Sequence, residues 1–379
     1  MYMDSVLGGI CLVSFAVLLW QWWEAVRLPL HQRLEKTPYA PDVTLFKPLK
    51  GCEPRTMECI ASWLEQDYQG NVQILFGVAD PQDPVLPELE RLLKRYPSAH
   101  TDTIICSEEL GANRKVSSLI QMSRRAGGEV WIISDADILA PKDLVRNIVQ
   151  PLSDPQNGAV NCLYQLVAPP GFAMSLEKIG VNADFWSQVA QSLRLSEQNF
   201  CLGAVMAVNA KVFRETGGFE PLANMLADDY HIGNRIHRGG KKIVLSPLVV
   251  DSIAHQACIR TVWGHQLRWA RTICFERPVS YGLSIISNTT FWAVLWLLGG
   301  SCSGRYIIAG CVLLIRVLAV ADLQRRLASN WSAARSAGLA WLKDLFQFMI
   351  WLCAFCGNQV EWRGQRFKVR KGGVLELKK

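Results

Sequence analysis

The chain has 379 residues, of which 50% are hydrophobic and 19% are charged, and its formal net charge is +7. The charged fraction lies below the roughly 25% typical of soluble domains, and the apolar content exceeds what one globular core needs, which disfavours a fully soluble protein. The basic residues form no stripe within a recognisable nucleic-acid-binding fold, so no nucleic-acid partner is expected.

The cysteines are scattered along the chain, and no histidine cluster at zinc-ligand spacing accompanies them. Most of them lie in apolar surroundings, where a cysteine behaves as a small hydrophobic residue. Reduced cysteines of this kind indicate a reducing compartment, so we expect most of the chain to face the cytoplasm.

The first apolar segment, residues 6–23, is an uncharged run long enough to cross the hydrocarbon core of a membrane, and it ends in a tryptophan cluster. Asp4 precedes this run, whereas Arg27, Arg33 and Lys36 follow it. A cleaved signal peptide would carry its basic residues before the apolar run. Residues 1–26 are therefore predicted to form a transmembrane anchor that leaves the following chain in the cytoplasm.

Between residues 41 and 277, short apolar runs alternate with amphipathic helical stretches, which is typical of an α/β domain with a parallel, doubly wound sheet. The predicted strands are residues 43–46, 72–78, 103–106 and 130–133, and the predicted helices are residues 56–66, 87–96 and 115–125. Ligands of such sheets bind at the carboxyl ends of the strands. The segments that follow residues 78 and 133 are therefore candidate site segments.

After residue 277 the chain becomes apolar again, with candidate membrane spans at 283–299, 306–321 and 339–355. An anchor plus three full spans would leave the basic C-terminus outside, against the positive-inside tendency. Because Lys343 and Asp344 interrupt the last candidate, we expect it to lie in the membrane interface. Residues 278–357 would then hold transmembrane and interfacial helices, and residues 358–379 a basic cytoplasmic tail.

Two carboxylates, Asp135 and Asp137, follow a predicted buried strand directly. Alternate carboxylates at a strand end are hard oxygen donors that can hold Mg²⁺ or Mn²⁺ beside a diphosphate. The alternative is a polar loop or a helix cap, because aspartate is common at strand ends.

A second acidic pair, Asp228 and Asp229, opens a predicted helix that runs to Arg238. A hydroxyl is a poor nucleophile until a positioned carboxylate accepts its proton, and Asp229 is the candidate for that base. Simple capping of the helix by Asp228 is the alternative.

A later amphipathic helix carries His265, Arg268 and Trp269 just before the second set of apolar segments. An arginine fork suits a diphosphate, and a tryptophan face can form a wall against a sugar or an acceptor. The alternative for Trp269 is an interfacial anchor without a catalytic role.

Three further donor-binding candidates depend on weaker patterns. Lys50 belongs to a Pro/Gly turn after the first strand, and Asp80 follows the second strand, where it can accept from a base or a ribose. Lys115 stands at the start of the third predicted helix, within reach of donor phosphates, although a solvated helix start explains it equally well.

These motifs together resemble the ceramide glucosyltransferase family, which is related to the inverting family-2 glycosyltransferases. In chain order they are Lys47-Pro48-Leu49-Lys50-Gly51, Asp80, Asp135-Ala136-Asp137, Asp228-Asp229-Tyr230 and Arg268-Trp269. The resemblance implies a GT-A fold, a UDP-sugar donor, and a divalent cation, Mg²⁺ or Mn²⁺, beside the donor diphosphate. It places Asp80 at the nucleotide, Asp135 and Asp137 at the metal and diphosphate, and Asp229 as the base, with Arg268 and Trp269 closing the site.

One position departs from the family pattern, because His265 stands where the family motif usually begins with Gln or Arg. The run from His265 to Thr272 is similar to that of the hopanoid-associated branch of the family. That similarity slightly favours a hopanoid polyol over ceramide as the lipid acceptor, and N-acetylglucosamine over glucose as the sugar. It also favours a bacterial inner membrane, with the catalytic domain at its cytoplasmic face.

Three other classes of protein remain as alternatives. A processive polysaccharide synthase would share the metal carboxylates but would need more spans to form a channel. A transporter would carry its functional polar groups within the spans, whereas the candidate carboxylates here lie in the α/β region. A noncatalytic membrane scaffold would bind the bilayer and release no UDP.

Overall fold

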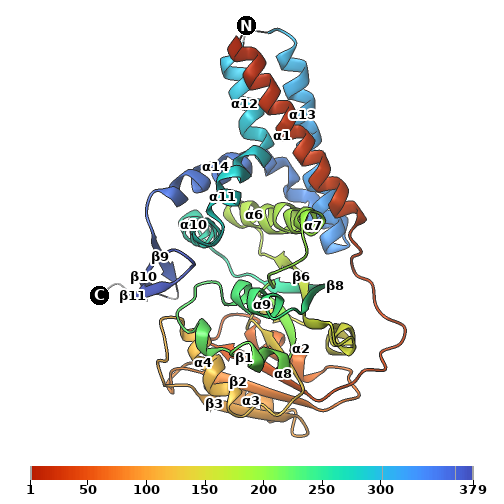
Figure 1. The fold of residues 1–379 in the computed structure, drawn as a ribbon, viewed down its shortest axis with the longest axis vertical. Coiled ribbons are helices and arrows are strands. Elements are labelled where there is room, and N and C mark those ends of the chain that lie inside the picture. The colour runs from red at the N-terminus through yellow and green to blue at the C-terminus, as the bar shows by residue number, and fades with distance from the viewer. Residues whose placement is uncertain (1, 301, 363, 378–379) are drawn as a thin grey trace.

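The protein is described by a computed structural model that covers residues 2–300, 302–362 and 364–377. Its centre is an eight-stranded sheet with the strand order β3-β2-β1-β4-β7-β6-β8-β5. Helices cover this sheet, and a bundle of apolar helices rises from one side of the molecule (Figure 1).

The first four strands are parallel, as the sequence predicts. They are β1 (Val43–Leu49), β2 (Val72–Val78), β3 (His100–Ile105) and β4 (Val130–Ser134), and the helices between them are α2 (Thr56–Leu64), α3 (Val85–Leu93) and α4 (Arg114–Ser123). β1 and β4 are buried along their whole length. Strands covered on both faces read as continuous apolar runs, which is why these were recognisable in the sequence.

The other half of the sheet is mixed, so the expectation of a parallel sheet holds only in part. Its strands are β5 (Ile138–Leu139), β6 (Asn157–Val167), β7 (Val205–Asn209) and β8 (Lys242–Ile253). β7 runs antiparallel to both β4 and β6, and β5 runs antiparallel to β8, while β6 and β8 are parallel. The α/β fold class is confirmed, with this mixed arrangement.

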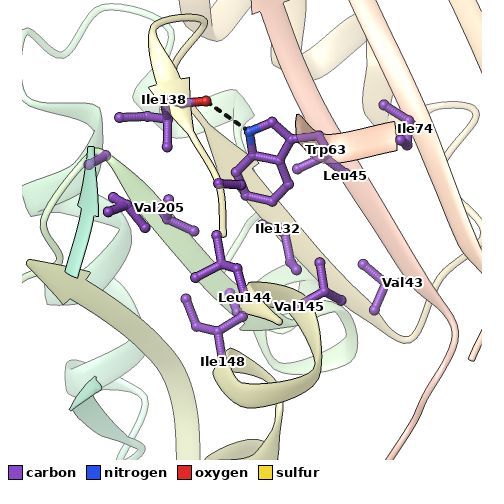
Figure 2. Close-up of a cluster of buried hydrophobic side chains, with 14 of the residues drawn as sticks. Val43, Leu45, Trp63, Ile74, Ile132, Ile138, Leu144, Val145, Ile148 and Val205 are labelled. Atoms are coloured by element: carbon purple, nitrogen blue, oxygen red, sulfur yellow. Dashed lines mark hydrogen bonds between the residues drawn. The ribbon is translucent and has the colours of Figure 1, made fainter. Parts of the chain in front are cut away.

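The main core lies between the sheet and the helices on one of its faces (Figure 2). Trp63 of α2 is 1% exposed and donates its indole N–H to the carbonyl of Ile138, at 3.2 Å. A buried tryptophan needs such a partner for its N–H group. The bond fixes α2 against β5, immediately after the Asp135 to Asp137 segment.

Three upright helices form the bundle (Figure 1): α1 (Tyr2–Arg27), α12 (Thr289–Gly299) and α13 (Arg305–Ala328). α1 and α13 are each long and apolar enough to cross a membrane. A segment of residues 278–287 joins α12 at a bend of 58°, so this pair is either a broken span or a re-entrant loop. The predicted anchor and the predicted span at 306–321 therefore both fall on helices of suitable length.

The last apolar helix, α14 (Ala340–Phe355), lies across the lower end of the bundle in Figure 1. Together with the 3-10 segment before it, this helix is also long and apolar enough to span a membrane. Its transverse direction is the one expected of an interfacial helix. The helices α6 (Phe172–Ile179), α7 (Trp186–Leu195) and α10 (Ile259–Glu276) lie between α14 and the sheet.

The remaining elements are short. They are α5 (Leu144–Ile148), α8 (Ala210–Glu215), α9 (Asp228–Arg238), α11 (Pro278–Leu283), a π-helical segment (Gly180–Phe185), and 3-10 turns at Gln150–Ser153, Glu220–Leu222, Ser284–Ser287 and Trp331–Leu339.

The C-terminal residues, expected to form a basic tail, instead form a three-stranded antiparallel sheet of β9 (Gln359–Trp362), β10 (Gln365–Val369) and β11 (Leu375–Leu377). Alternate residues of β10, Phe367 and Val369, are buried with Leu226 in a small apolar cluster. This two-residue alternation was the strand signal that the basic charge obscured.

A largely buried charge network joins the apolar bundle to the helices beneath it. Arg316 of α13 contacts Asp344 of α14 at 2.6 Å and Asp184 of the π-helical segment at 2.9 Å. Lys343 forms a further ion pair with Asp184, and Thr290 of α12 donates to Asp344. Two cations and two carboxylates balance, which is the condition under which buried charges are tolerated. Lys343 and Asp344 thus interrupt the apolar pattern because they belong to this network.

We expect Arg316→Gln to lower the thermal stability of the protein in detergent, because the change leaves the buried carboxylate of Asp344 and the largely buried carboxylate of Asp184 with only Lys343 between them. Loss of one partner from a buried pair costs about 3–5 kcal/mol. The control is Arg335→Gln, at an exposed arginine in the segment before α14, and it should leave the melting temperature unchanged. Equal melting temperatures for both variants would contradict the prediction.

Candidate active site

The site lies where the strand order reverses between β1 and β4. Pairing between these strands ends at Phe46 and Ile133, so the chains that follow diverge at the carboxyl edge of the sheet. Such a topological switch point is the usual binding crevice of an open α/β sheet. The Asp135 to Asp137 segment leaves β4 at this point.

Lys47 of β1 is fully buried beneath this crevice. Its ammonium donates to the backbone carbonyl of Asp135 and to the hydroxyl of Ser134, at 3.3 Å for the latter. Burial lowers the pKa of Lys47 to about 8, although the carboxylates of Asp137 and Asp135 act in the opposite direction. The lysine therefore places positive charge directly behind the acidic segment.

Asp135 and Asp137 occupy adjoining positions in the crevice, and both are partly exposed. The hydroxyl of Ser252, on β8, donates to Oδ2 of Asp137 at 2.6 Å. Burial, and then the charge of Asp135, raise the pKa of Asp137. The two carboxylates thus repel each other, and a divalent cation between them would relieve that repulsion.

The described residues include no group of three or more His, Cys, Asp or Glu side chains arranged to hold a metal ion. The two aspartates nevertheless fit a Mg²⁺ or Mn²⁺ ion that takes its other ligands from a bound diphosphate and water, since Mg²⁺ is usually held by one or two carboxylates plus phosphate oxygens.

Lys115 connects the two acidic motifs. Its ammonium lies 2.9 Å from Oδ1 of Asp135 and 3.1 Å from Oδ2 of Asp228. The Asp228 oxygen is buried and, within the described residues, receives no hydrogen bond of good geometry, so its contact with Lys115 is electrostatic. The carboxylates of Asp135 and Asp228 raise the pKa of Lys115 despite its burial, which alone would lower it. The solvated-helix-start interpretation of Lys115 is therefore wrong.

The start of α4 holds Lys115 in this position. Asn113 caps the helix by accepting from the backbone N–H of Val116 at 3.1 Å. The same side chain donates to the carbonyl of Met225 at 2.8 Å. One asparagine therefore ties the start of α4 to the loop that precedes Asp228.

Asp229 is the second residue of α9, and its carboxylate Oδ1 accepts from the backbone N–H of Tyr230 at 2.8 Å. The N-cap position of this helix is Ala227, whose side chain cannot accept a hydrogen bond, and Asp228 is the first helical residue. The interpretation of Asp228 as the cap is therefore wrong. Burial, and then the neighbouring Asp228, raise the pKa of Asp229 to about 6. A pKa near the working pH suits a general base.

The absence of a side chain at Gly203 leaves room for the carboxylate of Asp229. A Cβ atom at this glycine would lie 2.8 Å from Oδ2 of Asp229, closer than a carbon atom can approach without displacing it. Burial raises the pKa of the Tyr164 phenol on β6, and the neighbouring carboxylates of Asp229, Asp137, Asp135 and Glu177 raise it further.

α10 presents the third motif. Nδ1 of His265 lies 2.5 Å from Oε1 of Glu177 on α6, and its ring packs against Trp269 with 4.3 Å between ring centroids. Arg268 lies with its guanidinium carbon 6.0 Å from the ring centroid of Trp362 on β9. His265, Arg268 and Trp269 are all partly exposed.

The two remaining predicted residues, Lys50 and Asp80, are exposed at the ends of β1 and β2. Asp80 accepts from the N–H of Gln82 in a local turn. The two loops are connected instead by Asp83, which is 8% exposed and accepts from the N–H of Gly51 at 3.0 Å. Gly51 has a φ of 72°, a conformation that favours glycine.

Sequence reasoning assigned no role in the site to four residues that contribute to it: Lys47, which it quoted only within the Lys47 to Gly51 motif, and Tyr164, Glu177 and Ser252. A lysine in an otherwise buried strand was a signal for Lys47, since a buried ammonium requires partners. The other three come from β6, α6 and β8, and their distance along the chain from the carboxylates left no local pattern.

Comparison with known sequences identifies a family. The sequence model of glycosyl transferase family 21 matches residues 6–375. A ceramide glucosyltransferase from Gibberella zeae is 30% identical over 175 residues, which are 44% of this chain and 33% of the relative. Ceramide glucosyltransferase 1 from Caenorhabditis elegans is 20% identical over 363 residues, 92% of this chain and 76% of the relative. The chain thus spans a third of the first relative and about three quarters of the second.

Comparison with solved structures supports the fold. A mannosyltransferase from Pyrobaculum calidifontis, solved in complex with GDP-Man and Mn²⁺, superimposes with a TM-score of 0.60. The match covers 89% of this chain and 98% of that chain, at 19% sequence identity. The GT-A-like glycosyltransferase fold expected from the sequence is therefore confirmed.

We expect Lys115→Met to destabilise the protein by about 3 kcal/mol, because it leaves the buried carboxylate of Asp228 unpaired. The control is Lys94→Met, which removes an exposed pair with Glu90, 2.9 Å apart, and should cost less than about 1 kcal/mol. Thermal denaturation of both variants measures the difference. Adding Asp228→Asn to Lys115→Met should restore part of the lost stability. If it restores none, the stability loss of Lys115→Met does not come from the unpaired Asp228 carboxylate.

Proposed function

We propose that this chain, which belongs to glycosyl transferase family 21, transfers a sugar from a UDP-sugar to a hydroxyl of a membrane lipid. The observation that carries the proposal is Lys115, which joins Asp135 of the strand-end motif to Asp228 beside Asp229. A candidate diphosphate site and a candidate base therefore share one crevice, beneath helices that are apolar enough to enter a membrane.

In the proposed reaction Asp229 accepts the proton of the acceptor hydroxyl while that oxygen attacks the anomeric carbon from the side opposite UDP. The configuration at that carbon would invert. Burial and Asp228 raise the pKa of Asp229, which makes it a stronger base than a free carboxylate. Gly203 leaves the space in which its Oδ2 atom stands.

The leaving diphosphate would be bound by the positive groups of the crevice. Lys115 is the ammonium nearest to the carboxylates, and Arg268 suits bidentate contact with phosphate oxygens. Asp135 and Asp137 would hold a divalent cation, Mg²⁺ or Mn²⁺, whose chemistry is to stabilise the charge of the leaving phosphate. Asp80 and Lys50 are proposed at the nucleotide, and Trp269 at the sugar or acceptor.

His265 is proposed to contribute to donor binding through the fixed orientation of its imidazole ring. Because Glu177 holds Nδ1, the ring orientation is fixed and Nε2 is left for the other side of the imidazole. The partner of this ring is a carboxylate on α6, so the histidine is tied to the helices beneath the membrane bundle.

Two lipid acceptors fit the proposal. The similarity of the run from His265 to Thr272 to the hopanoid-associated branch slightly favours a hopanoid polyol with N-acetylglucosamine. The ceramide glucosyltransferases among the relatives favour ceramide with glucose about as well. In either case we propose an integral membrane protein, of a bacterial inner membrane in the hopanoid case, with residues 41–277 as the cytoplasmic catalytic domain.

The decisive experiment measures UDP release by the purified protein from UDP-glucose or UDP-N-acetylglucosamine, each with ceramide or a hopanoid polyol, and with Mn²⁺, Mg²⁺ or EDTA. We expect acceptor-dependent release that EDTA abolishes. Asp229→Asn should lower the rate about 100-fold or more, whereas Asp102→Asn, on the edge strand β3, should not. If Asp229→Asn releases UDP as fast as the wild type does, Asp229 is not the base.

The pH dependence gives an independent check. A base acts in its deprotonated form, so the transfer rate should rise with pH through about 6, where Asp229 titrates, and level off above that value. At pH 5 the rate should be about tenfold lower than the plateau, since one unit below the pKa leaves about a tenth of the carboxylate ionised. If the residual activity of Asp229→Asn falls below pH 6 in the same way as that of the wild type, another group is responsible for the pH dependence.

A further inference from the structure

A polar cavity lies where the C-terminal ends of α1 and α13 meet. Its volume is about 530 Å³. The polar lining comes from His31, Arg325, Arg326 and Asn330, and Trp331 forms one wall. No step of the proposed transfer uses these residues.

The cavity stands at the level where the bundle would leave a membrane. α1 and α13 are both long and apolar enough to span, and their last turns carry Arg27, Arg325 and Arg326. Trp22 and Trp23 precede this level on α1. Tryptophan and basic residues together mark the interfacial zone on the cytoplasmic side of a membrane protein.

The charge of the cavity is positive. Arg325 and Arg326 each form an ion pair of 2.7 Å with the same carboxylate, Asp322. In the described part of the chain these are the only ion pairs of the two arginines, so two guanidinium groups share one negative charge. The excess positive charge lies on the lining of the cavity, which includes both arginines.

Several contacts connect the residues of the cavity wall to one another and to the catalytic region. The guanidinium carbon of Arg325 lies 4.8 Å from the ring centroid of Trp331. His31 donates its Nε2–H to the carbonyl of Arg326 at 3.1 Å, and its backbone N–H binds the carbonyl of Pro247 at 2.7 Å. The backbone N–H groups of Ser329 and Asn330 bind the carbonyls of Arg326 and Arg325. The carbonyls of Arg325 and Arg326 therefore already accept hydrogen bonds, and the two guanidinium groups are the charged groups of the lining.

We propose that this cavity binds the phosphate headgroup of an anionic phospholipid. Basic pockets between membrane helices at their cytoplasmic end recognise such headgroups. Leu28 and Leu30 line the same cavity and supply apolar contact for the glycerol and upper acyl portion. A bound lipid would hold the end of α1 against the end of α13, where the anchor passes into the catalytic domain. The proposal depends on membrane placement and is independent of the transfer reaction.

The test compares lipid binding by full-length protein in detergent, measured as bound lipid in native mass spectrometry and as the shift of the melting temperature. The probes are phosphatidylglycerol, phosphatidylcholine and inorganic phosphate. We expect phosphatidylglycerol to bind and stabilise the wild type more than phosphatidylcholine does. Arg326→Gln should weaken phosphatidylglycerol binding about fivefold, the loss expected for one juxtamembrane basic residue.

The matched control is Arg335→Gln, because Arg335 is exposed in the following segment and does not line the cavity. It should bind phosphatidylglycerol as the wild type does. Equal loss in both arginine variants, or equal binding of both lipids by the wild type, would overturn the proposal. Stabilisation by inorganic phosphate equal to that by phosphatidylglycerol would also overturn it, in favour of a free-anion site. If Arg326→Gln lowers the starting melting temperature, lipid occupancy at 4 °C still separates the outcomes.

Discussion

The ion pairs of Lys115 are the interaction on which the candidate site depends. One ammonium faces Asp135 at the end of β4 and Asp228 at the start of α9, two segments almost a hundred residues apart. Without that charge the crevice would hold several carboxylates with only Lys47 behind them, and mutual repulsion would favour their protonation. Lys115 therefore allows a metal-type carboxylate pair and a candidate base to remain charged in one small volume.

Two further ion pairs lie between the site and the apolar bundle. Glu177 contacts His265 of α10, and seven residues later Asp184 contacts Arg316 of α13. Both acids belong to the helical stretch formed by α6 and the π-helical segment, and π-helical turns often occur at functional sites. The helical stretch that contacts α13 of the apolar bundle therefore also carries the partner of His265 on α10.

The C-terminal sheet of β9, β10 and β11 contacts two segments of the candidate site. Backbone bonds join Leu226 to Gly373 and Leu375 to Asn224, so the sheet holds the loop that leads into Asp228 and Asp229. Trp362 of the same sheet lies beside Arg268. Two candidate site segments, the start of α9 and the middle of α10, are thus braced by residues at the far end of the chain, and the site requires nearly the whole length of the protein.

The sequence by itself determined the features that depend on local pattern. Continuous apolar runs fixed β1, β2 and β4, charge and length indicated α1 and α13, and carboxylates after a strand end marked Asp135 and Asp137. The tertiary structure alone decided which distant groups meet: Lys47 and Ser252 beside the aspartates, Glu177 beside His265, Asp184 beside Arg316, and a sheet where basic composition suggested a tail. The physical reason is that periodicity reports which face of an element is buried, whereas the pairing of buried charges depends on how separate elements pack, and no local pattern records that.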